Sequence, residues 1–394
     1  MAAVFPDPTD LVDDPHPAYA RLREAGPVHR VTGPDGLPVW IVTRYADVRR
    51  LLADPRLSLD KAHRLPGHYR GFTLPPALDA NLLNMDPPDH TRIRGLVSRA
   101  FTPGRVERMR PGIQALADRL LERMAERGRA DLVAEYAAPL PITVICDLLG
   151  VPDESRRDFR EWTDALVAPD PADPGAAKRA VASMLAFFPA LIAAKRRVPG
   201  DDLLSDLVRV RDGGDRLTED ELTSLAFLVL VAGYENAVQL IGSSVLALLD
   251  HPRELAALRR DPGGIEDAVE ELARYDGPAL LAIRRFPVED VEIGGVTVPA
   301  GETVMLSLAS ADRDPDRFPR PDHLDLRRRD GGHLALGHGI HYCVGAPLAR
   351  LETQIAVGAL VSRFPSLKLD VPREELRWRP SLRARGLLAL PVRF

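Results

Sequence analysis

The chain has 394 residues with a formal net charge of -5, and 45% of its residues are hydrophobic. The charge argues against a nucleic-acid-binding protein, whose surface would be strongly basic. The longest apolar run, 225–232, is far too short to span a bilayer. Two cysteines, Cys146 and Cys343, are too few for a disulfide framework, and residues 1–14 lack the basic start and apolar run of a signal peptide. We therefore expect a cytoplasmic protein that binds neither nucleic acid nor membrane.

Helical periodicity dominates the chain, and segments rich in Pro and Gly interrupt it. We predict helices at 15–25, 44–53, 88–100, 104–127, 139–149, 153–168, 175–197, 203–211, 217–249, 251–260, 264–276 and 345–362. Short strands are expected at 28–32, 38–43, 291–298 and 303–308, with more after residue 366. Between the two apolar runs of 291–298, the pair Gly294-Gly295 is typical of a two-residue hairpin. The pattern predicts a mainly α fold with a small β region.

The predicted helix at 217–249 is unusually long. Thr218 and Glu221 form the Thr-x-x-Glu pattern of a capping box at its start. At about 1.5 Å per residue the helix would be roughly 50 Å long, about the width of a domain, so we expect a central strut. Ala232 and Gly233 lie midway along it. Residues this small allow either tight packing of another helix or the close approach of a flat group.

The segment 336–346 surrounds one thiol, that of Cys343, with glycines. These are Gly337, Gly339 and Gly345. Helical periodicity begins directly afterwards, with Pro347 in the first turn. A cysteine near a helix N-terminus is favoured as thiolate, because the free N–H groups and the helix dipole stabilise negative charge. Glycines also let a flat ligand approach the backbone closely. The alternative is an ordinary buried cysteine in a turn, and the glycine spacing argues against it.

This segment resembles the haem-binding signature of the cytochrome P450 superfamily, aromatic–Gly–x–Gly–x–His–x–Cys–x–Gly. Leu336 stands where the family usually has Phe, which removes an aromatic ring near the sulfur and bears on the reduction potential. The resemblance implies haem b as the cofactor, with Cys343 as the axial ligand of the iron and with Gly337 and Gly345 beside the haem. It extends from about residue 10 to Phe394. It therefore implies a single P450 domain over residues 1–394, where the length alone suggests two or three.

The two propionates of a haem need cationic or hydrogen-bond-donating partners. His90 and Arg94 are four residues apart on one face of the helix predicted at 88–100, and by themselves they are typical of a solvated basic helix start. The resemblance implies that both bind propionate. It implies the same role for Arg285, just before the Gly294-Gly295 turn, and for His341, two residues before Cys343.

The run from Ala232 to Asn236 resembles the family's Ala-Gly-x-Glu/Asp-Thr motif. The resemblance implies that Ala232 and Gly233 open a groove for dioxygen, and that Glu235 is the acid of a proton relay. Asn236 occupies the position of the usual Thr, which normally takes part in proton delivery. An amide can donate a hydrogen bond but does not give up a proton at neutral pH. We therefore expect Glu235 to supply the protons, through ordered water or through a hydroxyl of the substrate.

Glu271 and Arg274 are three residues apart on the helix predicted at 264–276. Their spacing alone is typical of a surface ion pair. The resemblance implies instead the buried Glu-x-x-Arg pair of the family, which supports the fold. It also names His323 as a third member, from the segment rich in Pro and Arg at 312–329.

By the same resemblance the protein is a monooxygenase that inserts one oxygen atom from O2 into its substrate, by hydroxylation or epoxidation. No Gly-x-Gly-x-x-Gly run follows a predicted strand, so electrons are expected from a ferredoxin and its reductase. Arg94 and Arg350 match family positions near the docking face, and plain surface solubility is the alternative. We expect a monomer.

The resemblance also places the substrate pocket. Its segments are 60–85, 164–190, 227–236, 280–283 and 382–388. Their side chains are mostly Leu, Ile, Val and Phe, which suits a bulky, mostly apolar small molecule. By analogy with similar bacterial enzymes we expect a polyketide, macrolide or peptide of antibiotic biosynthesis. The alternatives are oxidative coupling of aryl or peptide groups by the same haem, a haem-thiolate sensor without turnover, and a cysteine hydrolase.

Overall fold

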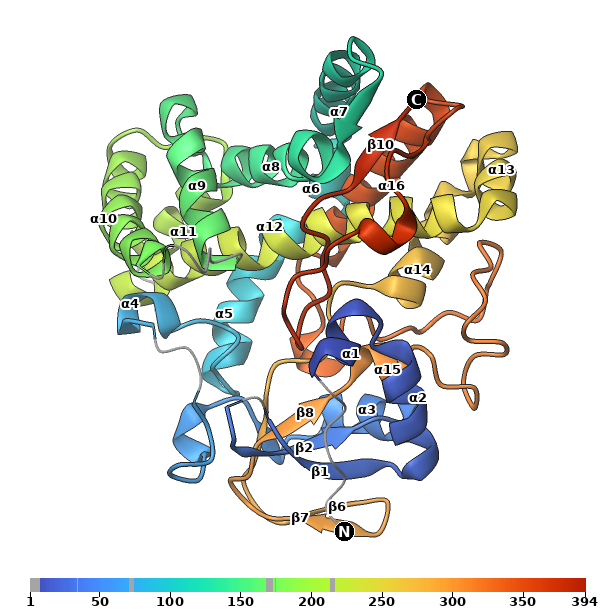
Figure 1. The fold of residues 1–394 in the computed structure, drawn as a ribbon. Coiled ribbons are helices and arrows are strands. Elements are labelled where there is room, and N and C mark those ends of the chain that lie inside the picture. Colours follow the sequence, from blue (N-terminus) through green and yellow to red (C-terminus); the bar gives the residue numbers. More distant parts are fainter. Residues whose placement is uncertain (1–7, 34, 71–73, 168–172, 174, 213–216) are drawn as a thin grey trace.

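The computed structural model describes residues 8–33, 35–70, 74–167, 173, 175–212 and 217–394 (Figure 1). The predicted predominance of helix is confirmed, and most predicted helices agree with the structure to within a few residues. The helices are α1 (Pro8–Asp13), α2 (His16–Ala25), α3 (Tyr45–Leu52), α4 (Pro76–Asp79), α5 (Asp89–Ser98), α6 (Pro103–Glu107), α7 (Arg110–Ala125), α8 (Pro139–Leu149), α9 (Arg156–Val167), α10 (Ala176–Arg197), α11 (Leu203–Asp212), α12 (Glu219–Asp250), α13 (Pro252–Arg260), α14 (Ile265–Asp276), α15 (Leu308–Ala311) and α16 (Ala346–Arg363).

The prediction of one helix over 104–127 is wrong, because the structure divides this stretch into α6 and α7. Pro111 lies in the first turn of α7. A proline has no backbone N–H, so Pro111 cannot donate the bond to Glu107 that a continuous helix would require. It also disfavours the helical conformation in the residue before it.

The long helix α12 runs through the middle of the molecule (Figure 1). The predicted capping box is confirmed: Thr218 accepts a bond from the Glu221 backbone N–H at 3.1 Å, and the Glu221 carboxylate accepts one from Thr218 N–H at 2.8 Å. With 32 residues α12 is roughly 48 Å long. Most of its side chains are buried against α4, α8, α14 and α16. The helix is therefore the strut on which the surrounding elements are placed.

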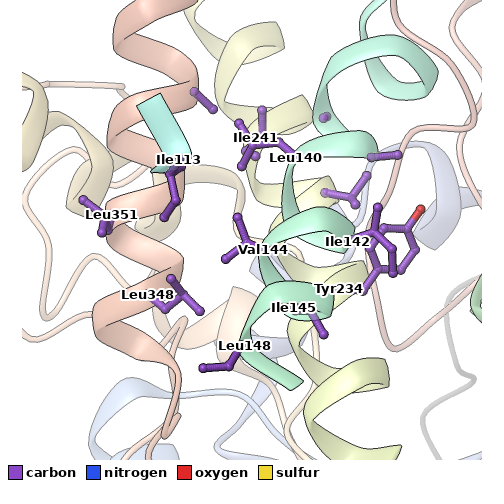
Figure 2. Close-up of a cluster of buried hydrophobic side chains, with 14 of the residues drawn as sticks. Ile113, Leu140, Ile142, Val144, Ile145, Leu148, Tyr234, Ile241, Leu348 and Leu351 are labelled. Carbon is purple, nitrogen blue, oxygen red and sulfur yellow. The ribbon is translucent and has the colours of Figure 1, made fainter. Parts of the chain in front are cut away.

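The largest buried core gathers side chains from four helices. Figure 2 shows Ile113 of α7, Val144 of α8, Ile241 of α12 and Leu348 of α16 in one cluster. All four side chains are less than 10% exposed. This packing fixes the middle of α12 relative to the start of α16. The Cys343 segment comes directly before α16, so the core sets the distance between the two parts of the predicted site.

Most of the β region lies at the far end of the molecule from α7, but the small sheet that contains β10 (Pro391–Arg393) lies at the same end as α7 (Figure 1). The main sheet has the order β1 (Val28–Thr32), β2 (Pro38–Val42), β8 (Val304–Leu306), in which β1 and β2 are antiparallel and β2 and β8 are parallel. The remaining strands are β3 (Leu57–Ser58), β4 (Arg129–Asp131), β5 (Phe286–Pro287), β6 (Val291–Ile293), β7 (Val296–Val298), β9 (Lys368–Leu369) and β10 (Pro391–Arg393). The small β region is confirmed.

The predicted hairpin is confirmed at its predicted turn. β6 and β7 pair in antiparallel register, with Ile293 opposite Val296. Gly294 and Gly295 have φ values of 57° and 81°. Two consecutive positive φ values define the turn whose twist matches a hairpin, and glycine adopts them without steric cost.

Glu271 and Arg274 form a buried ion pair on α14, as the resemblance implies. Two bonds join them, at 2.7 and 2.8 Å, and both side chains are at most 2% exposed. The prediction of His323 as their partner is wrong, because its side chain is exposed. The third charged member is Arg328, whose Nε lies 3.1 Å from Glu271 and whose side chain is 7% exposed. The longer guanidinium reaches the buried carboxylate from the loop, which the imidazole does not.

Two helices, α10 and α12, are long and apolar enough to cross a membrane by length and composition alone. In α12 67% of the apolar window is buried inside the protein, and in α10 28% is buried. The apolar composition of α12 is therefore explained by its place in the core.

Candidate functional site

The segment that carries Cys343 turns tightly between Leu334 and α16. Gly337 and Gly339 adopt positive φ values of 78° and 73°. A Cβ on Gly339 would lie 3.1 Å from the Ala53 Cα, so the close approach of this segment to the end of α3 requires glycine. Gly345 has a φ of -83°, and the nearest atom to a Cβ there would be 3.9 Å away, so its backbone imposes no such requirement. The turn places Cys343 three residues before the first residue of α16.

Cys343 is a free, half-buried thiol. Its backbone N–H donates to the Leu336 carbonyl at 2.9 Å, which closes the turn. Burial raises the pKa of the Cys343 thiol, while the Gly345 backbone N–H and the guanidinium groups of Arg94 and Arg350 oppose that rise. The surroundings therefore supply positive charge and an N–H donor to a thiolate. Cys146, in contrast, is fully buried in the apolar core, where burial raises its pKa to about 12.

Four predicted propionate-binding residues converge beside the Cys343 segment. The rings of His90 and His341 lie 4.2 Å apart between centroids, although they come from α5 and the cysteine turn. Arg94 donates to the Tyr342 carbonyl at 2.5 Å. Arg285 is 4% exposed and donates to two backbone carbonyls at 3.3 Å. Burial, with nearby positive groups, lowers the pKa of His341 to about 3.

Two nitrogens in this cluster have no hydrogen-bond partner among the described residues. They are His90 Nε2 and Arg285 Nε, and both are buried. Buried polar atoms nearly always have a partner, because desolvation without one is costly. A cluster of cationic and donor groups in which two buried nitrogens lack partners among the described residues suits an anionic ligand with two carboxylates.

The middle of α12 differs from the rest of the helix. Ala232, Gly233 and Asn236 are exposed, although the residues around them are mostly buried. A Cβ on Gly233 would lie 2.9 Å from Ile145 Cδ1, so Gly233 allows tight packing of α8. Asn236 Nδ2 lies 3.4 Å from the Ala232 carbonyl. Gly233 therefore allows tight helix packing, as the first explanation of the small residues requires. Ala232, like Asn236, is accessible, as the approach of a flat group requires.

Glu235 lies on the same stretch of α12 and is 14% exposed. Its carboxylate contacts the Arg379 guanidinium and accepts a bond from Gln239 Nε2 at 3.1 Å. Burial raises the pKa of Glu235, and the Arg379 charge opposes that rise. Glu235 is therefore an acid in a fixed position, with one carboxylate oxygen, Oε2, that has no partner among the described residues.

These residues fit a bound haem b. They supply a thiol in a positive environment, four cationic or donor side chains near it, and an accessible stretch of α12 with a buried acid. Since two buried nitrogens of the propionate cluster lack acceptors among the described residues, a ligand carboxylate would complete their bonding.

The comparisons with known proteins agree with this geometry. A model of the family Cytochrome P450 matches residues 265–385. The chain is 52% identical over 393 residues to cytochrome P450 monooxygenase PikC of Streptomyces venezuelae, which covers 98% of this chain and 92% of that protein. The chain belongs to the cytochrome P450 family. Haem b, bound through a cysteine thiolate, is the cofactor of this P450, and the predicted monooxygenase class is confirmed.

Two further similarities bear on the reaction. Mycinamicin IV hydroxylase/epoxidase of Micromonospora griseorubida is 42% identical, over 95% of this P450 and 94% of that protein. The solved structure of CxnD, a cytochrome P450 enzyme for C–S bond formation in chuangxinmycin biosynthesis, has a TM-score of 0.88 and 38% identity, over 100% of this chain and 97% of that one. The predicted P450 fold is confirmed. Because this P450 is a monooxygenase, it is neither a haem-thiolate sensor without turnover nor a cysteine hydrolase.

The sequence did not reveal three side chains that the structure places around Glu235, those of Arg379, Gln239 and Asp164. Arg379 and Gln239 contact it directly, and Tyr234 donates from its hydroxyl to Asp164 of α9 at 2.8 Å. Gln239 could have been found, because it lies four residues after Glu235 on the same face of α12. Arg379 and Asp164 lie far away along the chain, and no spacing pattern joins them to α12.

Proposed function

We propose that this P450 inserts one oxygen atom from O2 into a bulky, mostly apolar natural product, by hydroxylation or epoxidation. The proposed substrate is a polyketide, a macrolide or a peptide. The observation that carries the proposal is the similarity over 95% of the chain to mycinamicin IV hydroxylase/epoxidase. The name of that relative includes both hydroxylation and epoxidation.

In the proposed site Cys343 binds the haem iron as thiolate, and His90, Arg94, Arg285 and His341 hold the two propionates. Gly337 and Gly345 lie beside the haem. Haem bound through a thiolate activates dioxygen for insertion into C–H and C=C bonds. Besides binding propionate, Arg94 donates to the Tyr342 carbonyl and stabilises negative charge on Cys343.

On the opposite side, we propose that Ala232 and Gly233 leave room for dioxygen and that Glu235 supplies protons. Asn236 replaces the usual Thr and does not itself give up a proton. Its amide is accessible, so it can hold a water or a substrate hydroxyl in place. Proton delivery then depends on Glu235 and on a hydroxyl or water that joins it to the reaction centre.

The proposed substrate pocket is mostly apolar. Among the described residues of its segments, Leu388 is 51% exposed although Leu387 beside it is buried. Phe227, Leu280 and Leu281 are apolar as well, and each is less than 10% exposed. The segments 60–85 and 164–190 lie partly outside the described residues. A bulky apolar compound with a few oxygens suits this lining.

We propose that a ferredoxin and its reductase deliver the electrons. Arg350, expected near the docking face, has structural partners of its own. It donates to Glu270 at 2.5 Å and to the Tyr342 hydroxyl at 3.0 Å. It braces the cysteine turn and is 31% exposed. Burial lowers the pKa of the His338 imidazole in the cysteine turn, and the nearby charge of Arg49, an exposed residue of α3, lowers it further. We add Arg49 to the proposed docking face.

We also propose the domain organisation, the cellular location and the oligomeric state of this P450. A single domain over residues 1–394 is supported by the largest core cluster, which includes residues from Leu78 to Val392, and by a second cluster that joins residues 28–57 to residues 291–334. A soluble, cytoplasmic location is supported by the family, because related bacterial P450s are soluble enzymes. We propose a monomer.

A second candidate reaction is oxidative coupling. The similarity over the whole chain to CxnD, which forms a C–S bond, favours it. Both reactions would use the same haem and the same pocket, and they differ in whether oxygen is retained in the product.

The direct test supplies purified protein with ferredoxin, ferredoxin reductase, NADPH and a panel of macrolides and other polyketides under ¹⁸O2. The proposal predicts a product that carries one ¹⁸O atom. A product with no added oxygen would support coupling instead. Consumption of NADPH with neither product for every compound would contradict the proposed substrate class.

A further inference from the structure

A hairpin near the C-terminus, residues 377–388, is attached to α12 by two side chains. Glu235 contacts the guanidinium of Arg379. Gln239 accepts a bond from the Leu387 backbone N–H at 2.8 Å through its side-chain oxygen. Glu235 and Gln239 are four residues apart and lie on one face of the helix. The acid proposed for proton delivery is therefore one of two attachment points of this hairpin.

The hairpin holds Arg379 in a fixed place. The Arg379 backbone N–H donates to the Gly386 carbonyl at 2.8 Å, and Leu388 N–H donates to the Arg377 carbonyl at 2.9 Å. A Cβ on Gly386 would lie 2.6 Å from Gln239, so the hairpin approaches α12 more closely than other residues allow. The backbone thus fixes the point from which the Arg379 side chain reaches Glu235, and that side chain is 16% exposed.

Charged and polar groups from three elements face Glu235. Arg379 comes from the hairpin, Gln239 from α12 itself, and Asp164 from α9. Burial is the largest influence and raises the pKa of Glu235; Arg379 and Gln239 lower it, and Asp164 raises it. Without Arg379 the remaining influences would make Glu235 a weaker acid.

We propose that Arg379 is a positioning residue, whose guanidinium orients the Glu235 carboxyl and keeps it a strong enough acid to deliver protons to the reaction centre. This inference rests on the proposed monooxygenase function. A buried acid works best when its proton affinity matches the working pH, and the charge of Arg379 offsets the effect of burial. Arg379 itself touches neither substrate nor haem in this role.

The reaction shows how the role can be measured. Insertion uses O2, two electrons, two protons and the substrate, and it yields the oxygenated substrate and one water. When protons arrive too late or at the wrong oxygen atom, the same two electrons and two protons leave with O2 as hydrogen peroxide. The yield of product per NADPH consumed therefore reports on proton delivery.

The test compares Arg379→Gln, Arg379→Lys and the matched control Arg377→Gln. Arg377 lies two residues earlier on the same hairpin, is exposed, and is not among the groups that act on Glu235. Each variant is purified with haem bound, and the Glu235 carboxyl is followed by infrared difference spectroscopy against Glu235→Gln as pH is raised. Product and peroxide per NADPH are then measured with ferredoxin and reductase.

We expect the ionisation of Glu235 to move to higher pH in Arg379→Gln, and the product per NADPH to fall at least about threefold, with peroxide making up the difference. Arg379→Met, a second neutral variant, should behave in the same way. Arg379→Lys should restore most of both properties, and Arg377→Gln should match the wild type in both.

The proposal is overturned if Glu235 ionises at the same pH in Arg379→Gln as in the wild type, or if Arg379→Lys behaves like Arg379→Gln. The infrared titration needs no substrate, electron donor or turnover. If the wild type forms no oxygenated product, the proposed function is contradicted. The infrared titration would still test the role of Arg379.

Discussion

Asn236 is the site residue that departs furthest from the family pattern. Its side-chain nitrogen lies 3.4 Å from the Ala232 carbonyl, at the long end of hydrogen-bond distances, and the side chain is accessible. It is therefore available to a water or to a substrate hydroxyl. The sequence was sufficient to predict this position, because the Ala-Gly-x-Glu run is contiguous on one helix.

If a substrate hydroxyl completes the proton path, coupling should depend on that hydroxyl. We expect the wild type to form less product and more peroxide per NADPH with a deoxy analogue than with the natural substrate. Asn236→Thr should restore coupling with the analogue. Equal coupling with both substrates in the wild type, together with an unchanged Asn236→Ala variant, would show that this side chain has no part in proton delivery.

Glu352, on α16, is a buried acid that the sequence did not single out. It is 2% exposed, its Oε1 has no partner among the described residues, and burial raises its pKa to about 8. A carboxyl whose pKa is raised by folding binds a proton when the chain folds. The stabilisation that the protonated Glu352 gives to the folded protein is therefore fully present below the ordinary pKa of about 4.5. It is lost as pH rises through about 8.

Glu352→Gln should remove this pH dependence. Between pH 5 and 8 the free energy of unfolding of the wild type should fall, relative to that of Glu352→Gln, by up to about 1.4 kcal/mol per pH unit. Chemical denaturation at several pH values measures the difference. Glu374→Gln, at an exposed position, is the control and should follow the wild type. Parallel curves for the wild type and Glu352→Gln would show that Glu352 is not protonated in the folded protein.

Among the elements, those defined by local patterns were predictable. The Gly294-Gly295 turn and the Thr218 capping box depend on neighbouring residues, and the structure has both. Long-range partners were not predictable in the same way. Arg328 reaches Glu271 from an irregular loop, and Arg379 reaches Glu235 from the C-terminal hairpin, so neither follows from periodicity or spacing.

The buried pair on α14 gives a prediction at this scale. Arg274→Ala should lower the free energy of unfolding by about 3–5 kcal/mol, because it leaves the Glu271 carboxylate buried with one partner fewer. Denaturation midpoint and haem content measure the loss. The control is Arg329→Ala, whose side chain is 82% exposed and paired with Asp267 at 3.1 Å; its cost should be below about 1 kcal/mol. Equal effects of the two substitutions would contradict the structural role of the buried pair.

At the scale of the whole molecule, the family resemblance spanned nearly the whole chain and gave the fold that the structure has. The resemblance implied that α12 and the cysteine turn lie on two sides of one site, which periodicity alone could not suggest, because it places no helix relative to another. The side-chain network that joins α12, α9 and the C-terminal hairpin around Glu235 came from the structure.

Electron delivery is also a property of the whole surface. If a ferredoxin docks beside the cysteine turn, Arg49→Glu should slow its reduction of the haem at least about tenfold, and added salt should reduce the difference by screening the charges. Reduction by dithionite should be unchanged. The control is Arg157→Glu on α9, whose side chain is 84% exposed. Equal rates with ferredoxin for Arg49→Glu and the wild type would remove Arg49 from the docking face.

The central claim is that Cys343 is the thiolate ligand of the haem iron, and the spectrum of the reduced carbon monoxide complex tests it most directly. The wild type should show the strongly red-shifted Soret band of thiolate ligation. Cys343→Ala should lose that band, and Cys146→Ala should keep it, because Cys146 is a fully buried core residue. A red-shifted band that persists in Cys343→Ala would contradict the account.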